Sequence, residues 1–328
     1  MNLKLVSATF ARITLFAAIY TLFRLDIALA QEQSSGTQDG NQLGQQVAGS
    51  NMREGDKLKL EKIANLPAVI QENSALLFWD DALWTVNDSG NEAKLYKISP
   101  QTGAILSEYS FTTAQNKDWE ALAQSDSFIY IGDIGNNFSK RKDLCIYIIR
   151  KTDLLNSAPT PLQTHQIKFQ YPEQEVWGTN YQDSEWDAEA MIYYNDSLHI
   201  FTKNWAKQYT SHYRIPAKEG EYAAEKVAEI DIEGLVTDAT IEPMTGRIAL
   251  LVYTKSHESF VLFAQDYPNS NFFEGQIRKH KLGHMLKVGQ VEGITFGTPT
   301  HVYISSEALK IPKIKIRKQP KLVRFRLP

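Results

Sequence analysis

The stretch Asp187-Ala188-Glu189-Ala190-Met191-Ile192 sets a glutamate at the start of an apolar run, and similar stretches return along the chain. The other copies are Asn73-Ser74-Ala75-Leu76-Leu77-Phe78, Asp118-Trp119-Glu120-Ala121-Leu122-Ala123, Val236-Thr237-Asp238-Ala239-Thr240-Ile241 and Val291-Glu292-Gly293-Ile294-Thr295-Phe296. Their hydroxyl or glutamate positions, 74, 120, 189, 237 and 292, are 46, 69, 48 and 55 residues apart. Repeats of this length that contain several short strands are typical of propeller blades.

Strand patterns fill the rest of each repeat. Runs such as Arg247-Ile248-Ala249-Leu250-Leu251-Val252 alternate with turn sequences such as Pro243-Met244-Thr245-Gly246, and no sustained helical period is present. We therefore predict an all-β fold with five blades, at residues 74–111, 119–170, 188–231, 236–282 and 291–327. The last blade has three strand patterns, so residues 57–63 are expected to supply its fourth, which pairs the N- and C-terminal strands and closes the ring. A six-bladed propeller, with one blade in the longer second interval, is the alternative.

The composition fits a single globular domain. The 328 residues are 43% apolar and 22% charged, as in proteins with a large core. The formal net charge of −3 gives no reason to expect nucleic acid as the main partner. The single cysteine, Cys145, lies in an apolar strand pattern and is expected to be a buried hydrophobic residue. We expect a monomer.

Residues 1–30 have the features of a secretory signal peptide. Lys4 and Arg12 precede the apolar stretch 13–23, and a small-residue cleavage site ends at Ala30. Cleavage after Ala30 would give a secreted or periplasmic protein, and an uncleaved anchor is the alternative. Residues 31–56 are rich in Gln, Ser, Gly and Asn, so we expect a disordered linker before one domain at 57–328.

The repeat places polar residues on one face of the predicted propeller. The first strand of a blade lines the axis and the second runs antiparallel to it, so the start of one and the end of the other share a face. The predicted second strands end in polar turns, at 87–90, 132–137, 202–205, 253–255 and 305–307. We therefore expect a ligand site for a small molecule or a glycan on this face.

The three glutamates of the repeat predict a calcium site on the axis. Carboxylates that meet at one point repel each other, which raises their pKa values or requires a counter-ion. Ca²⁺ takes about 6–8 oxygen ligands with tolerant geometry, and the absence of His and Cys here disfavours Zn²⁺. The predicted ligands, one per blade, are Ser74, Glu120, Glu189, Thr237 and Glu292. Alternatively, the glutamates cap backbone N–H groups or bind water in the channel.

These phrases resemble those of the calcium-activated nucleotidases, or soluble apyrases, over about residues 70–300 at low identity. The similarity lies in the Ser-led strand at Ser74, the Glu-led strand that runs from Glu120 to the glycines at 132 and 135, Glu189-Ala190, Thr237-Asp238, and Glu292-Gly293-Ile294. The resemblance implies a five-bladed propeller with an axial Ca²⁺ held by Ser74, Glu120, Glu189, Thr237 and Glu292. The phrases Asn-Asp-Ser-Gly (87–90), Asp-Trp-Glu-Ala-Leu-Ala (118–123) and Ile-Gly-Asp-Ile-Gly-Asn-Asn (131–137) are also similar to those of a group of exported bacterial propellers.

The chain departs from the nucleotidase pattern where that family binds phosphate. Lys203, Asn204 and Trp205 stand in place of its third-blade arginines, and the turn at 87–90 has no arginine either. The missing bidentate arginines weaken the case for nucleotide hydrolysis. If the protein is an enzyme, the first expectation is metal-dependent hydrolysis of a phosphate or phosphoester. In this hypothesis Asp88 and Asp133 orient water. The predicted ligand-binding residues are Asn87, Asn136, Asn137, Arg141, Lys203, Lys255 and Glu307.

Two other functions stay open. One is a glycosidase-like hydrolase, with an acid/base pair drawn from Asp118, Asp133, Asp187 and Glu307. The other is a non-catalytic propeller that binds a glycan or a protein. Four tryptophans are able to stack on a sugar or a base, although blade packing explains the first and third at least equally well: Trp119, Trp177, Trp186 and Trp205.

The C-terminal segment is strongly basic. Between residues 310 and 326 it has eight Lys and Arg residues and no acidic residue, and 311–317 alternates like an amphipathic strand. A solvated sheet edge is one interpretation. Attachment to an anionic envelope surface is the other.

Overall fold

The computed structural model describes residues 52–156, 161–298, 300–311 and 316–328, all within the compact unit Gln45–Pro328. The predicted signal peptide, its cleavage after Ala30 and most of the predicted linker lie outside the described residues. In the described part of the chain, no helix is both long enough and apolar enough to span a membrane.

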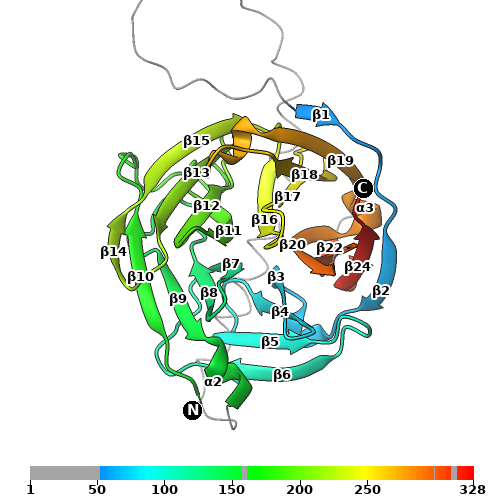
Figure 1. The fold of residues 1–328 in the computed structure, drawn as a ribbon, viewed down its shortest axis with the longest axis horizontal. Helices are drawn as coiled ribbons and strands as arrows, with labels where there is room; N and C mark the ends of the chain where they lie inside the picture. Colours follow the sequence, from blue (N-terminus) through cyan, green and yellow to red (C-terminus); the bar gives the residue numbers. More distant parts are fainter. Residues whose placement is uncertain (1–51, 157–160, 299, 312–315) are drawn as a thin grey trace, which may run out of the picture. The chain divides into compact units, whose positions relative to one another are not determined.

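The described residues form five β-sheets arranged as blades around a common axis (Figure 1). The innermost strands are β3 (Asn73–Trp79), β7 (Trp119–Gln124), β11 (Ala188–Tyr194), β16 (Leu235–Ile241) and β20 (Gln290–Thr298). Each of these strands contacts the next, and β20 contacts β3. The prediction of an all-β, five-bladed propeller is confirmed, and the six-bladed alternative is wrong.

Two blades consist of four antiparallel strands in chain order, except that in blade three the short strand Gly220–Ala223 lies between the third and fourth strands and pairs with the neighbouring blade. Blade one continues from β3 with β4 (Ala82–Asn87), β5 (Lys94–Ile98) and β6 (Ile105–Ser110). Blade three continues from β11 with β12 (Ser197–Thr202), β13 (Tyr209–Pro216) and β15 (Glu225–Asp231).

Two other blades carry a fifth, parallel strand on their outer edge. Blade two contains β8 (Phe128–Asp133), β9 (Cys145–Arg150), β10 (His165–Gln170) and the edge strand β14 (Gly220–Ala223). Blade four contains β17 (Ile248–Tyr253), β18 (Glu258–Gln265), β19 (Gln276–His284) and the edge strand β1 (Met52–Glu54). Regular structure therefore begins before residue 57, inside the predicted linker, because β1 satisfies its backbone groups on β19.

Blade five combines strands from both ends of the described chain. It contains β21 (His301–Glu307), β24 (Lys321–Arg326) and β2 (Glu61–Asn65), and β2 pairs antiparallel with β24. The segment predicted for this position, 57–63, overlaps β2. The basic C-terminal segment includes the small hairpin of β22 (Leu309–Ile311) and β23 (Ile316–Lys318), whereas residues 312–315 lie outside the described residues.

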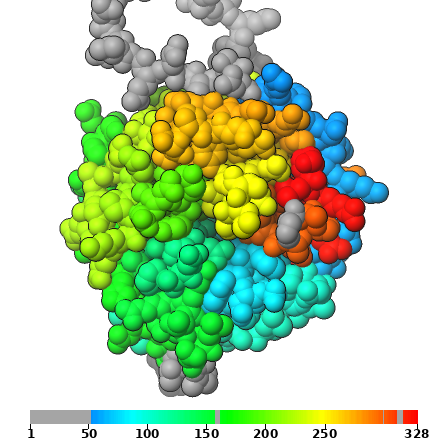
Figure 2. Space-filling view, viewed as in Figure 1, coloured from blue at the N-terminus to red at the C-terminus, as the bar shows by residue number. Residues whose placement is uncertain are grey.

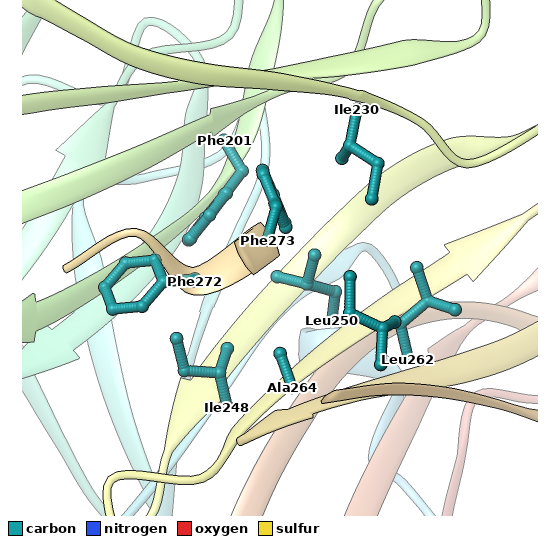
Figure 3. Close-up of a pocket in the computed structure, with 9 residues that line it drawn as sticks. Phe201, Ile230, Ile248, Leu250, Leu262, Ala264, Phe272 and Phe273 are labelled. Carbon is teal, nitrogen blue, oxygen red and sulfur yellow. The ribbon is translucent and has the colours of Figure 1, made fainter. Parts of the chain in front are cut away.

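Short helices connect some of the strands. They are η2 (Ala68–Ile70), α2 (Lys151–Asn156), η3 (Phe272–Glu274) and α3 (Met285–Val288). Of these, η3 inserts two phenylalanines, Phe272 and Phe273, between blades three and four (Figure 3). The gap that remains there measures about 10 Å³, which is no larger than the space that one water molecule needs. Its lining is apolar, so it is a packing defect rather than a ligand site.

Among the described residues the hydrophobic core consists of five clusters, one at each blade–blade interface. Both faces of each sheet are covered, which is why strands such as 144–149 are continuous apolar runs without alternation. Cys145 is buried in this core, as predicted, and Trp119 is buried there too, so of its two open roles the structure shows blade packing. Figure 2 shows that side chains fill the spaces between blades that the ribbon leaves open.

Candidate functional site

The repeated sequence positions coincide with β-bulges in the inner strands. In four of the five blades the pairing with the second strand skips one residue, and that residue is Glu120, Glu189, Thr237 or Glu292. A bulge leaves the extra residue unpaired and redirects its side chain. In blade one the irregularity lies just after Ser74, where Ala75 has a φ of 64°, an unusual value for a residue other than glycine. The repeat is therefore a backbone feature as well as a sequence pattern.

Three of the predicted metal ligands are buried glutamates that interact electrostatically with one another. The Ser74 hydroxyl donates to Glu120 Oε2 at 2.8 Å, so the blade-one and blade-two positions touch directly. Burial raises the pKa of Glu120 well above its ordinary value, and the charge of Glu189 adds to this rise. Burial likewise raises the pKa of Glu189, with Glu292 as a further contributor. The fifth predicted ligand, Thr237, instead donates its hydroxyl to the Val291 carbonyl at 3.0 Å.

Three half-buried carboxylates surround this group. Burial, together with the charges of Glu72, Asp118 and Glu292, raises the pKa of Asp88 to about 8. Burial raises the pKa of Asp118 to about 6. Burial also raises the pKa of Glu307, together with the charges of Glu292 and Asp88. We call the six carboxylates the axial acidic cluster: Asp88, Asp118, Glu120, Glu189, Glu292 and Glu307.

Amide and glycine residues shape the cluster. Gln290 donates its amide to Glu292 at 3.1 Å and also contacts Glu307, so it links two carboxylates of blade five. Only glycine fits at position 135, because the Asp118 carboxylate occupies the space that a Cβ would take. Any larger residue at 135 would push Asp118 away from the cluster.

Lys203 is the cation that acts on the buried glutamates. Its ammonium group pairs with Glu189 Oε2, and both side chains are almost fully buried. The nitrogen also lies 4.8 Å from the centre of the Trp205 ring and 5.1 Å from that of Tyr253. Burial opposes the charged form, but Glu189, Tyr253 and Glu292 outweigh it and raise the pKa of Lys203 well above its ordinary value. One ammonium group thus faces several carboxylates.

The predicted residues of blade two form a separate polar network. Arg141 Nη1 lies 2.7 Å from Asp133 Oδ1 and donates to the Gly135 carbonyl at 3.0 Å, while Arg141 Nε donates to Asp143 at 3.2 Å. Asp133 is fully buried and also accepts the Asp118 N–H at 2.9 Å. Asp133 was predicted as one of two residues that orient water, and Arg141 as a residue that binds an anion; in the structure the two form an ion pair with each other.

The predicted ligand-binding asparagines of the turns form hydrogen bonds with backbone groups. Asn87 donates to the Val69 carbonyl at 2.8 Å, and the Asn136 side chain accepts the Arg141 N–H at 2.9 Å. The Asn137 carbonyl accepts the Gln182 N–H at 3.3 Å. Lys255 is exposed, and its carbonyl lies 2.9 Å from His257 Nδ1.

Asp238 is an axial residue that the repeat did not single out. Its carboxylate accepts the N–H groups of Leu76 at 3.1 Å, Ala239 at 2.8 Å and Ile294 at 2.7 Å. It therefore joins the inner strands β3, β16 and β20 on the axis. Its position directly after the bulged Thr237 is the sequence signal that would have found it.

The structure offers oxygen ligands and negative charge but no ready-made metal cage. Across the described ranges, no group of three or more His, Cys, Asp or Glu side chains is arranged to hold a metal ion. The donors at the axis are carboxylates and a hydroxyl, which match a hard cation such as Ca²⁺ in chemistry.

Comparison with known proteins finds only distant structural similarity. No protein-family model matches the chain, and no curated protein does. Among solved structures, the PQQ-bound aldose sugar dehydrogenase from Streptomyces coelicolor is similar with 9% identity and a TM-score of 0.45, over 84% of this chain and 100% of that one. The Kuenenia stuttgartiensis hydrazine synthase has 12% identity and a TM-score of 0.38, over 79% of this chain and 66% of that one, slightly under two thirds.

A third similar structure contains the WD40 repeats of RRP9, with 9% identity and a TM-score of 0.38, over 82% of this chain and 100% of that one. Identities this low assign no activity to this chain. None of these comparisons identifies the chain as a calcium-activated nucleotidase.

Proposed function

We propose that this protein is a propeller that binds a cation in the axial acidic cluster, and that Ca²⁺ is the cation. The observation that carries the proposal is the excess of buried carboxylates over Lys203, the ammonium group that pairs with Glu189. Buried like charges raise each other's pKa values, so a bound divalent cation would remove a repulsion that the fold sustains.

The residues that would hold Ca²⁺ are Glu120, Glu189 and Glu292, with the Ser74 hydroxyl. Glu120 and Ser74 already touch, and Glu292 is oriented by Gln290. Glu189 is engaged with Lys203, so cation binding requires this ammonium group to move away. Ca²⁺ and Lys203 therefore compete for one carboxylate.

Hydrolysis is a second candidate function, and the pKa values of two half-buried carboxylates favour it. With a pKa of about 6 for Asp118 and about 8 for Asp88, one group is mostly ionised and the other mostly protonated near neutral pH. Such a pair suits general acid–base catalysis. Binding of phosphate has less support, because Arg141 and Lys203 are paired with carboxylates. A non-catalytic role in binding a glycan or a protein remains the alternative to hydrolysis.

Two measurements test these proposals. Isothermal titration with CaCl₂ should show saturable binding to the wild-type protein, binding in Glu120→Gln that is weaker by tenfold or more, and little change in the exposed control Glu108→Gln. Wild-type protein that takes up no Ca²⁺ would end the cation proposal. Assays with nucleotides, other phosphoesters and oligosaccharides, with and without Ca²⁺, then separate hydrolysis from binding alone.

A further inference from the structure

A second cavity lies in blade two, away from the axial acidic cluster. Its volume is about 220 Å³. Arg141, Lys142 and Leu144 line it from the connection between β8 and β9, and Phe169 and Gln170 line it from β10. The segment that follows β10 contributes Tyr171, Gln174 and Trp177.

Backbone hydrogen bonds hold the two sides of this cavity together. The Gly178 N–H donates to the Ser139 carbonyl at 3.0 Å, and the Thr179 N–H donates to the Phe138 carbonyl at 2.9 Å. Phe169 and Tyr171 pack edge to face at 5.5 Å between ring centres. The cavity is therefore framed by paired backbone and core aromatic residues.

One side of the cavity is aromatic and carries positive charge. Trp177 is 41% exposed, an unusual state for a tryptophan in a folded domain, and the Lys142 ammonium lies 4.8 Å from the centre of its ring. Within the described residues, Lys142 has no carboxylate partner. Arg141 Nη2 and the Tyr171 hydroxyl are buried and have no hydrogen-bond partner there either. Unpaired buried donors are uncommon and point to a missing acceptor.

We propose that this cavity binds a hexuronic acid, that is, a six-membered sugar ring with one carboxylate. A cavity of about 150 Å³ accommodates benzene, so the present volume has room for one substituted six-membered ring. Trp177 covers the apolar face of the ring, and Lys142, which has no carboxylate partner among the described residues, attracts the carboxylate. The charge of Arg141 is already balanced by Asp133 and Asp143, so Arg141 contributes only a hydrogen bond from its unpaired Nη2. Gln170 and Gln174 offer amides to the hydroxyl groups. This site does not depend on cation binding at the axis.

The probe for the test is glucuronate, followed by saturation-transfer NMR and isothermal titration with the full chain. We expect saturable binding of glucuronate. Glucose, which lacks the carboxylate, and benzoate, which lacks the hydroxyl groups, should each bind more weakly by about tenfold or more. Trp177→Ala and Lys142→Gln change exposed side chains and should each reduce glucuronate affinity by about tenfold while they keep the thermal midpoint. The matched controls Leu106→Ala and Lys218→Gln, both exposed, should bind as the wild type does.

Three results would overturn the proposal. The first is no saturable binding of glucuronate at millimolar concentrations. The second is equal binding of glucuronate by wild type, Trp177→Ala and Lys142→Gln, which would place the ligand elsewhere. The third is tighter binding of benzoate than of glucuronate, which would show that the cavity recognises aromatic acids and not sugars.

Discussion

Two sets of buried carboxylates meet the axis of this propeller, and they are satisfied in different ways. Asp238 accepts three backbone N–H groups, from Leu76, Ala239 and Ile294, and so joins three blades. The nearby glutamates interact instead with side chains: Glu120 accepts a hydrogen bond from the Ser74 hydroxyl, and Glu189 pairs with the Lys203 ammonium group. Burial raises the pKa of both kinds. The contrast separates a carboxylate that holds the fold from the carboxylates that we propose bind a cation.

The largest expected effect comes from the removal of the structural carboxylate. Asp238→Ala leaves three buried N–H groups without an acceptor and should lower the free energy of unfolding by about 4 kcal/mol, as measured in urea. The control Asp231→Ala, whose carboxylate accepts the Glu233 N–H near the surface, should lower it by less than about 1 kcal/mol. Equal effects of the two variants would contradict the special role of Asp238.

The next effect concerns the lysine that pairs with the open set. Lys203→Met should lower the free energy of unfolding in calcium-free buffer by about 2 kcal/mol, because it leaves the buried Glu189 without its cation. The loss is smaller than for a carboxylate that stays charged, since Glu189 can take up a proton. The same variant should bind Ca²⁺ more tightly than the wild type, since the competitor for Glu189 is gone. Lys207→Met, which breaks an exposed pair with Glu185, is the control and should change neither quantity. Weaker Ca²⁺ binding by Lys203→Met would show that the lysine supports the site instead.

A buried pair of histidines extends the comparison to bases, whose pKa values burial lowers rather than raises. His199 Nδ1 lies 2.8 Å from His212 Nε2, and both rings pack on Phe272 in the core. Burial lowers the pKa of His199 to about 4 and lowers that of His212 as well. The unfolded chain therefore binds more protons between pH 6.5 and 4. The stability that the neutral His199 ring contributes is complete above pH 6.5 and is lost as the pH falls.

We expect the free energy of unfolding to fall by about 2 kcal/mol from His199 alone between pH 7 and pH 5. The axial carboxylates with raised pKa values change the stability in the opposite sense over this range, so urea unfolding of the wild type and of His199→Phe at several pH values measures the loss as the difference between the two. NMR of the two rings provides an independent check, and a ring that titrates near pH 6.5 in the folded protein would contradict the prediction.

The smallest effect comes from one member of the open set. Glu120→Gln keeps an acceptor for the Ser74 hydroxyl and removes one repelling charge, so it should raise the free energy of unfolding by about 1 kcal/mol in calcium-free buffer. Thermal unfolding of the variant and of Glu108→Gln gives the comparison. A loss of stability in Glu120→Gln would mean that the glutamate is a structural group like Asp238.

The sequence predicted the glutamates but not the aspartate, and the reason is geometric. Glu120, Glu189 and Glu292 stand out because a polar side chain before an apolar run is conspicuous and repeats once per blade. In blade four the same pattern pointed to Thr237, yet the bulge directs that hydroxyl to the Val291 carbonyl. The adjacent Asp238 lies where two other blades present N–H groups, which no local pattern shows.

Partners from distant strands were also beyond the sequence. The strand β1 lies in a stretch with the composition of a linker, and it is recognisable only from the free edge of β19 that it covers. By contrast, the pair of Lys203 and Glu189 follows from antiparallel pairing of β11 and β12, since both residues lie at the same end of these strands. The sequence thus predicted the scaffold and the charged face, while the individual contacts depended on tertiary structure.

The central claim is that the axial acidic cluster holds a cation, and thermal unfolding against Ca²⁺ concentration tests it most directly. A ligand at 100 times its Kd stabilises the folded state by about 2.7 kcal/mol, which corresponds to a rise of several degrees in Tm. The account predicts that rise for the wild type, a smaller rise with Mg²⁺, and a clearly smaller rise for Glu120→Gln, which binds Ca²⁺ more weakly. An unchanged Tm in the wild type, or an equal rise in Glu120→Gln, would contradict it.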